Sequence, residues 1–317
     1  MRKTVNRVTV SGRIYDFDIA EKVTGETSKV PGTPYIGGSI SVATDDDCLN
    51  VIKVEFTYVT ATTKAGTANR TYGVLQKIIN DGKTILNDGK DDATKVKIDT
   101  ALGLNDFYTD RNGEETLVSA KRCQGGFVTI VSSLDEDENK RNTFECDMLI
   151  NNVVRVEADP EKNIDKDFVK VKGAVFDFKQ AILPVEFIVK AESGMKYFES
   201  LDASSQNPVF TQVRGIINSE TIVHKVEEES AFGEPSVKEY KRNVREWIIT
   251  WTSRPDATYE VGDAETGVTA EEIKSKMADR EIYLADIKKR ADEYKASKVA
   301  GTSNVASAPA ALGGFDF

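Results

Sequence analysis

Two copies of one eight-residue motif, far apart in the chain, constrain the fold more than any other feature of this sequence. The first copy, VSGRIYDF, begins at Val10, and the second, VKGAVFDF, begins at Val171. Three shorter similarities follow in the same order in both halves: Val54–Phe56 with Val185–Phe187, Gly73–Ile79 with Gly194–Leu201, and Lys140–Glu145 with Lys241–Glu246. This order favours a duplicated domain with extra loop in the first copy. The alternative, that these residue types recur by chance in any β protein, stays open.

The length and charge of the chain limit its organisation and its partners. With 317 residues it can form one large domain or two ordinary ones with additions. The net charge of -10 and the pI near 5.0 argue against a nucleic-acid binder that depends on overall positive charge. A local basic groove on an acidic body remains compatible with these values.

Cysteine usage and the N-terminus predict the compartment. Cys48, Cys123 and Cys146 are scattered and lack metal-ligand spacing, which fits a reducing compartment better than a disulfide framework. Residues 1–10 lack the apolar segment of a signal peptide, and no run approaches the roughly 18 apolar residues that span a bilayer. We therefore expect a soluble, cytoplasmic protein, located in the host cytoplasm if a phage encodes it.

Most of the first 255 residues have the composition of β-strands: short runs rich in Val, Ile, Thr, Phe and Tyr, separated by Gly, Asn, Asp and Pro. The clearest runs are Arg7–Phe17, Gly38–Thr44, Val51–Thr60, Lys95–Leu104, Gly126–Ser132, Thr143–Val156, Phe168–Phe178, Pro184–Lys190, Phe210–Asn218, Glu220–Val226 and Val244–Thr252. A short helix is expected near Tyr72–Ile79 and another near Met195–Leu201, each after a third strand. Three strands, a helix and two strands form the element order of an OB barrel, a five-stranded, partly open Greek-key barrel.

The composition changes after Pro255. A polar linker leads to Thr269–Glu272, which fits a helix-capping box, and a charged helical segment continues to about Ser297. Its apolar residues recur at three- and four-residue steps, so the helix packs either on its own domain or on a partner. The remaining small residues predict a disordered tail.

The predicted fold is mainly β, with two tandem OB barrels followed by a helix and a tail. We expect an N-terminal OB domain with long loop insertions over residues 1–157 and a second OB-like domain over 158–256. The linker and charged helix take 257–298, and the disordered tail takes 299–317.

Several segments resemble bacterial and phage single-stranded DNA-binding proteins. Val5–Ile14 resembles their first strand, Gly38–Thr44 their second, and Val96–Leu104 with Asp110–Gly113 their fourth strand and following hairpin. The terminal GGFDF is similar to their partner-recruiting tip. The chain departs from that pattern, since its two tryptophans, Trp247 and Trp251, lie in the second half and its tip holds one aspartate. The loop between strands three and four is long and the second barrel is an addition, so a divergent phage-type member fits best.

The resemblance implies an OB protein that coats single-stranded DNA and recruits partners through its tip. Such domains stack bases on aromatic side chains and follow phosphates with Lys and Arg. Strand alternation puts Val8, Val10, Gly12 and Ile14 on a core face and the intervening residues on the other face. The candidate nucleic-acid-binding residues are Arg13, Tyr15, Phe17, Tyr58, Arg70, Tyr72, Phe107, Tyr108, Arg111, Arg122, Lys170, Lys172, Phe176 and Phe178.

Two alternatives bear on these candidates. A bulge at Gly12 or Gly173 would turn the neighbouring aromatics into the core, so Tyr15, Phe17, Phe176 and Phe178 are either base platforms or core residues. Trp247 and Trp251 differ by four positions, so alternation puts them on one face, and we expect at least one to be buried.

The tail and the polar residues complete the functional predictions. Phe315, Asp316 and Phe317 form the expected partner-binding tip, which combines an apolar anchor with negative charge. His224 is the single histidine, no phosphate-binding loop or catalytic triad is present, and the acidic runs lack calcium-loop spacing. We therefore expect no enzyme activity, no metal and no cofactor.

The sequence as a whole predicts a single-stranded DNA-binding protein that acts in DNA replication or recombination and recruits replication or recombination proteins through its tip. We expect no membrane partner. A second hypothesis is a non-enzymatic, β-rich structural or interaction protein of the virion type, whose acidic charge and strand content would be similar. A third, an RNA-binding OB protein, differs only in its ligand.

Overall fold

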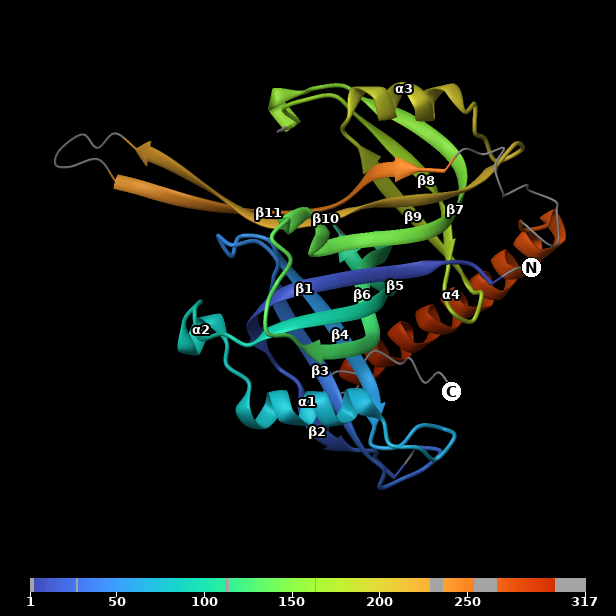
Figure 1. Ribbon diagram of the computed structural model, residues 1–317. Helices are drawn as coiled ribbons and strands as arrows, with labels where there is room; N and C mark the ends of the chain where they lie inside the picture. The colour runs from blue at the N-terminus through green and yellow to red at the C-terminus, as the bar shows by residue number, and fades with distance from the viewer. Residues whose placement is uncertain are drawn as a thin grey trace.

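The strands of this chain join into one continuous sheet. The computed structural model describes residues 3–26, 28–111, 114–162, 164–228, 236–253 and 267–299. Within these ranges, eleven strands pair in the order β10-β11-β9-β8-β7-β1-β5-β6-β4-β3-β2, and Figure 1 shows them as two stacked barrels with a long helix beside them. The protein is mainly β, as predicted.

Five strands of the first half close into a barrel. They are β1 (Asn6–Phe17), β3 (Pro34–Ala43), β4 (Val51–Thr60), β5 (Lys95–Arg111) and β6 (Glu114–Ile130). Strand β1 pairs antiparallel with β3 and β5, β3 with β4, and β5 with β6, and a parallel contact between β4 and β6 closes the ring. Helix α1 (Arg70–Asp81) lies between the third and fourth strands of the barrel. This connectivity is that of an OB barrel.

The second barrel repeats the same connectivity. Its strands are β7 (Asn142–Val156), β8 (Phe168–Phe176), β9 (Ile182–Val189), β10 (Val209–Glu228) and β11 (Ser236–Thr252), with α3 (Glu192–Ser200) after the third. Strand β7 pairs with β8 and β10, β8 with β9, β10 with β11, and β9 runs parallel to β11. The prediction of two tandem OB barrels is confirmed. Beyond the barrel, β10 and β11 continue as a two-stranded ribbon that projects from the molecule (Figure 1).

Short elements decorate the barrels. They are β2 (Ala20–Val23), α2 (Ile85–Asp88) and the 3-10 turns η1 (Glu138–Lys140) and η2 (Pro160–Lys162). Strand β2 extends the sheet beyond β3, while α2 lies in the long connection between α1 and β5. The expected long loop of the first copy therefore contains helical turns.

The repeated sequence motifs align only partly with the repeated structure. The Val54 and Val185 motifs both lie on third strands, and the Gly73 and Gly194 motifs both lie on the helices after them. The eight-residue motif, however, covers the first strand of one barrel and the second strand of the other, so that alignment is wrong by one strand. The last pair also differs in position. Lys140 precedes β7, the first strand of the second barrel, whereas Lys241 lies within β11, the fifth strand of that barrel.

The glycines of the eight-residue motif explain why it recurs on different strands. A Cβ atom on Gly12 would lie 1.9 Å from the carbonyl oxygen of Ala43 on β3, and one on Gly173 would lie 2.0 Å from that of Leu149 on β7. Each glycine thus lies where the first two strands of its barrel leave no room for a side chain, and the two glycines are on opposite strands of the pair. The expected domain division after residue 157 stays a prediction. Because β7 pairs with β8 and β10 of the second barrel, the strand pairing favours a boundary before Asn142.

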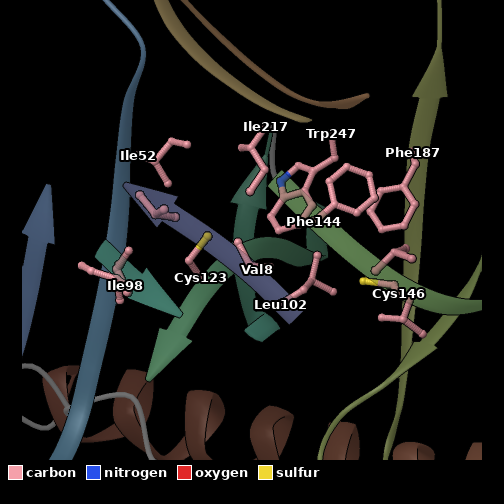
Figure 2. Packing of buried hydrophobic residues seen from close by; sticks show 14 of the residues in the cluster. Val8, Ile52, Ile98, Leu102, Cys123, Phe144, Cys146, Phe187, Ile217 and Trp247 are labelled. Carbon is pink, nitrogen blue, oxygen red and sulfur yellow. The ribbon is translucent and has the colours of Figure 1, made fainter. Parts of the chain in front are cut away.

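A shared core and direct strand pairing join the barrels. Residues 6–10 of β1 pair with residues 142–146 of β7. One cluster of buried residues runs through both barrels, and in Figure 2 Phe144, Phe187 and Trp247 pack together beside Val8. The ring centroids of Phe144 and Phe187 are 4.9 Å apart, and those of Phe187 and Trp247 are 5.9 Å apart.

The long C-terminal helix packs on both barrels. Helix α4 (Ala270–Val299) begins with the predicted capping box, in which the Glu272 amide donates to Thr269 Oγ1 at 3.2 Å. Val268 and Ile273 pack against the second barrel, while Arg280 bonds Asp106 on β5. The helix therefore packs on its own chain, although two of its apolar residues, Met277 and Tyr294, are exposed. None of the helices in the described ranges is long and apolar enough to cross a lipid bilayer.

Candidate nucleic-acid interface

The outer face of β1 holds the first group of predicted residues. Val8, Val10 and Ile14 are fully buried, and Arg13 and Tyr15 are half-buried on the opposite face, as alternation predicts. Arg13 Nη1 lies 3.2 Å from Asp46 Oδ1, and this carboxylate also contacts Arg141. These two guanidinium groups hold the pKa of Asp46 below its usual range. Arg13 thus anchors the loop before β4.

Phe17 and Tyr72 lie at the margin of the first core. Both are half-buried and pack against the main hydrophobic cluster, so only part of each ring reaches the surface. A bulge in β1 between Ile14 and Asp16 changes the direction of the strand before Phe17. Arg70 is exposed at the first position of α1, beyond the Asn69 cap.

Tyr58 lies at the rim of the first barrel. Its side chain is 47% exposed, whereas Phe56, two residues earlier, is buried. Its ring centroid is 4.8 Å from that of Tyr35 on β3. Tyr35 was missed because it is an isolated aromatic near the start of its strand. Tyr35 is also paired with Lys22 on β2, the strand on the other side of β3, so aromatic and basic residues are neighbours at this rim.

The β5–β6 hairpin brings predicted residues together beneath α4. Phe107 is 40% exposed, and Lys288 Nζ of α4 lies 5.4 Å from the ring centroid of the neighbouring Tyr108. Arg122 Nη1 contacts Glu55 Oε2 at 2.9 Å and is mostly buried. The side chain of Arg111 lies outside the described residues. Helix α4 therefore covers part of this predicted surface, and Phe107 is the predicted aromatic residue that stays exposed there.

A cluster of lysines occupies the outer face of the second barrel. Lys170 and Lys172 on β8 lie 3.1 and 3.7 Å from the carboxylate of Glu186 on β9. Lys121, from β6 of the first barrel, donates to the Glu186 carbonyl oxygen and lies over the ring of Phe187. Burial lowers the pKa of Lys121 to about 8. We call Lys121, Lys170, Lys172 and Glu186 the lysine cluster.

The position of this cluster matters because β8 and β9 are the second and third strands of their barrel. In OB folds, this face and the loops beside it bind oligonucleotides and oligosaccharides. Lys121 was missed because it is one of several basic pairs along the chain, and its neighbour Arg122 was chosen instead. The pairing between the barrels is what brings it to Glu186.

Phe176 does not belong to a surface, and its prediction as a stacking platform is wrong. Its side chain is fully buried and meets Phe210 edge to face, with ring centroids 6.3 Å apart. The reason is that Val268, just before α4, covers this end of the barrel, so residues on both faces of β8 become buried. Phe178 lies beyond the strand and is 59% exposed, with Lys179 Nζ 5.7 Å from its ring centroid.

The remaining predictions concern the tryptophans, the tip and metals. Trp247 is buried and Trp251 is 46% exposed, so the two do not share a face. The tip residues 315–317 lie outside the described residues. Within the part of the chain that the structure describes, no group of three or more His, Cys, Asp or Glu side chains is arranged to hold a metal ion.

Comparison with known proteins places the chain in a family. Residues 4–299 match the family model described as YorF. The chain belongs to the YorF family. No curated protein matches the sequence of this YorF-family chain.

Two solved structures are similar to this YorF-family chain at low levels. A deletion mutant of the single-stranded DNA-binding protein from Thermus aquaticus matches over 80% of this chain and 96% of its own, with 12% identity and a TM-score of 0.44. A replication protein A heterotrimer bound to single-stranded DNA matches over 76% of this chain and 49% of its own, with 10% identity and a TM-score of 0.20. The OB assignment therefore rests on the strand pairing of this chain itself.

Proposed function

We propose that this chain binds single-stranded DNA through its two OB barrels, without sequence preference. The observation that carries this proposal is the lysine cluster. In it, Lys170 and Lys172 lie on the barrel face that binds ligands in other OB folds, Lys121 comes from the other barrel, and Glu186 is the one carboxylate among them. A strand that follows these ammonium groups would contact both barrels.

Exposed aromatic side chains supply the second requirement of such a site. Tyr58 beside Tyr35, Phe107 on the β5–β6 hairpin and Phe178 beside Lys179 each present part of a ring to solvent. Stacking of a base on an aromatic ring contributes about 1–3 kcal/mol and tolerates any sequence, because every base has a π-face. Since a fold alone does not determine function, the proposal depends on these side chains.

Local charge resolves the conflict with the acidic composition. The chain carries a net charge of -10, yet the lysine cluster has three cations and one carboxylate. Nucleic acid responds to the local field, and neutralised phosphates release counterions when they bind. Binding should therefore weaken as salt increases.

The wider role follows from the sequence. We infer a non-enzymatic protein, of phage type, that coats and protects single strands in DNA replication or recombination. The tip, Phe315 to Phe317, would recruit replication or recombination proteins. The free thiols of Cys48, Cys123 and Cys146 fit the reducing cytoplasm.

The proposal is tested by fluorescence anisotropy of a dye-labelled oligo-dT titrated with the full chain at low and high salt. The informative variant is Lys170→Gln with Lys172→Gln, which removes two cations from the face of β8. Its matched control is Lys77→Gln with Lys162→Gln, which removes two exposed lysines elsewhere and changes the net charge equally.

The wild type and the control should bind in a salt-sensitive manner. The cluster variant should bind more weakly and depend less on salt. The negative slope of log K against log salt should become shallower by about 1.4, or about 0.7 for each phosphate that the variant leaves without a cation. If the wild type does not bind at low salt, the proposal is wrong and a structural or interaction module becomes the better hypothesis. If both variants weaken equally, the lysine cluster is not the binding face.

A further inference from the structure

The outer face of the sheet where the barrels join carries a row of side chains that sequence reasoning missed. Arg7 on β1, Glu145 on β7, Arg214 on β10 and Trp251 on β11 are successive cross-strand partners. Directly paired residues of a sheet point to the same face. The four side chains therefore form one row that runs from the first barrel onto the second.

A bulge brings Trp251 to the surface. Trp247 and Ile249 are buried, and simple alternation would bury Trp251 as well. The register between β10 and β11 shifts between Arg214 and Gly215, so that Thr250 is an extra residue and both it and Trp251 are exposed. The bulge thus turns one of the two tryptophans of the chain toward solvent.

The guanidinium group of Arg214 already lies over the ring of Trp251. The guanidinium carbon of Arg214 lies 4.5 Å from the ring centroid of Trp251. Glu145 Oε1 accepts from Arg214 Nε at 3.0 Å and lies 2.9 Å from its Nη2, which holds the guanidinium group in place. A fixed cation over an aromatic ring forms a rigid edge against which a base can stack at little ordering cost.

A groove lies beside this row, with a volume of about 610 Å³. This is within the roughly 300–1,000 Å³ typical of ligand sites. The polar side chains that line it are Arg7, Thr9, Asn139, Thr143, Glu145, Arg214 and Thr250. Gly215 also lines the groove, and a Cβ atom added there would lie 2.6 Å from the Phe144 ring. We call these residues, with Trp251, the junction groove.

The neighbouring row of the same sheet ends in another exposed aromatic. Thr143, Thr9, Asp99 and Phe127 are successive cross-strand partners on β7, β1, β5 and β6. Phe127 is 74% exposed, the highest value among the large hydrophobic side chains in the described ranges. The face thus presents an aromatic ring at each end, with hydroxyl, guanidinium and carboxylate groups between them.

We propose that the junction groove is a second contact site for single-stranded DNA, in which a base stacks on Trp251 beside Arg214 and a neighbouring phosphate binds Arg7. The site rests on the proposed function but uses other strands than the lysine cluster. Among the residues that line the groove, the guanidinium groups of Arg7 and Arg214 outnumber the one carboxylate of Glu145, which favours an anionic ligand there. The carboxylate of Asp99, in the neighbouring row, accepts a hydrogen bond from Thr9. Three strand spacings of about 4.8 Å separate β1 from β11, so a strand stacked on Trp251 needs to extend roughly 14 Å to reach Arg7.

The two tryptophans allow a direct test, because one is buried and the other is exposed. The full chain, Trp247→Phe and Trp251→Phe are titrated with dye-labelled oligo-dT while tryptophan emission and dye anisotropy are recorded together. Emission should be quenched on binding in the wild type and in Trp247→Phe, which keeps Trp251, and should stay nearly constant in Trp251→Phe. Acrylamide should quench Trp251 less when DNA is bound.

Affinity is compared in three further variants. Trp251→Ala should weaken binding about tenfold, whereas Trp251→Phe keeps a ring and should bind nearly as the wild type does. Arg7→Gln should make the negative slope of log K against log salt shallower by about 0.7. Ile282→Ala, at an exposed position of α4, is the control and should bind normally.

The outcomes separate this inference from the proposed function. If the labelled DNA binds the wild type but Trp251 emission is unchanged and Trp251→Ala keeps full affinity, the junction groove is not a DNA site and the proposed function stands. If the wild type shows no change in anisotropy, the proposed function fails and this site fails with it.

Discussion

Arg280 on α4 and Asp106 on β5 form a buried ion pair that joins the C-terminal helix to the first barrel. Arg280 Nη2 lies 2.8 Å from Asp106 Oδ1, and Nη1 lies 3.3 Å from Oδ2. The side chains are 9% and 2% exposed, respectively, and Ser119 also donates to the carboxylate. A two-point contact of this kind fixes the helix in one orientation.

Loss of Arg280 should release α4 and destabilise the barrel. Arg280→Ala leaves the carboxylate of Asp106 buried without its cation, and removing one partner of a buried pair costs about 3 kcal/mol or more. Urea unfolding should show this loss, and hydrogen exchange should show faster exchange in α4. The double variant Arg280→Met with Asp106→Leu should recover most of the stability, and wild-type stability of Arg280→Ala would contradict the prediction.

Lys121 should make stability depend on pH in the alkaline range. Burial lowers its pKa from the ordinary 10.5 to about 8, so between these values the folded chain has lost a proton that the unfolded chain still holds. Stability then rises with pH from about 8 to 10.5, by about 3 kcal/mol, and this contribution is constant below pH 8.

The measurement compares urea unfolding at pH 7.5 and pH 10 in the wild type and in Lys121→Met. Other groups also titrate in this range, so the prediction concerns the difference between the two proteins. The wild type should gain more stability than the variant on going to pH 10. Equal pH dependence in both proteins would show that Lys121 is not desolvated.

Gly12 should not tolerate a side chain. An alanine Cβ there would lie 1.9 Å from the Ala43 carbonyl oxygen, and both atoms belong to the backbone of paired strands. Gly12→Ala should lower the free energy of unfolding by about 3 kcal/mol, near the upper end of overpacking costs. In contrast, Gly73→Ala in α1 meets nothing within 4 Å and should raise it by about 0.5–1 kcal/mol. Thermal unfolding of the two variants checks the pair.

Deletion of residues 313–317 should leave DNA binding equal to or tighter than that of the full chain. The segment carries the negative charge of Asp316, which would compete with phosphates for basic groups. Anisotropy of oligo-dT with both forms measures the effect. Weaker binding by the shortened chain would mean that the tip contributes to the DNA site and is not reserved for partners.

Alternation of residues along single strands was enough to predict most of the fold. The buried Val8, Val10 and Ile14 and the order of strands and helices led directly to two OB barrels. The repeat alignment failed because Gly12 and Gly173 satisfy the same close strand approach from opposite strands. Such a motif indicates that two paired strands leave no room for a side chain at the glycine. It does not indicate which of the two strands carries that glycine.

The candidate site was less predictable because contacts between distant segments decide it. Phe176 is buried by Val268, which lies 92 positions later in the chain, and Lys121 reaches Glu186 only because the two barrels are paired. Trp251 emerges at a bulge whose other strand carries Gly215. No pattern within β11 marks that extra residue, so alternation assigned both tryptophans to one face.

The pairing of β1 with β7 also determines how the two barrels would cooperate. Two modules on a flexible linker help each other by an effective concentration that depends on linker length. Here hydrogen bonds between residues 6–10 and 142–146 hold one barrel at a set angle to the other. For any ligand long enough to contact both barrels, avidity would therefore depend on the fixed pairing of β1 with β7 and not on the length of a linker. Lengthening the connection between β6 and β7 should change that avidity little.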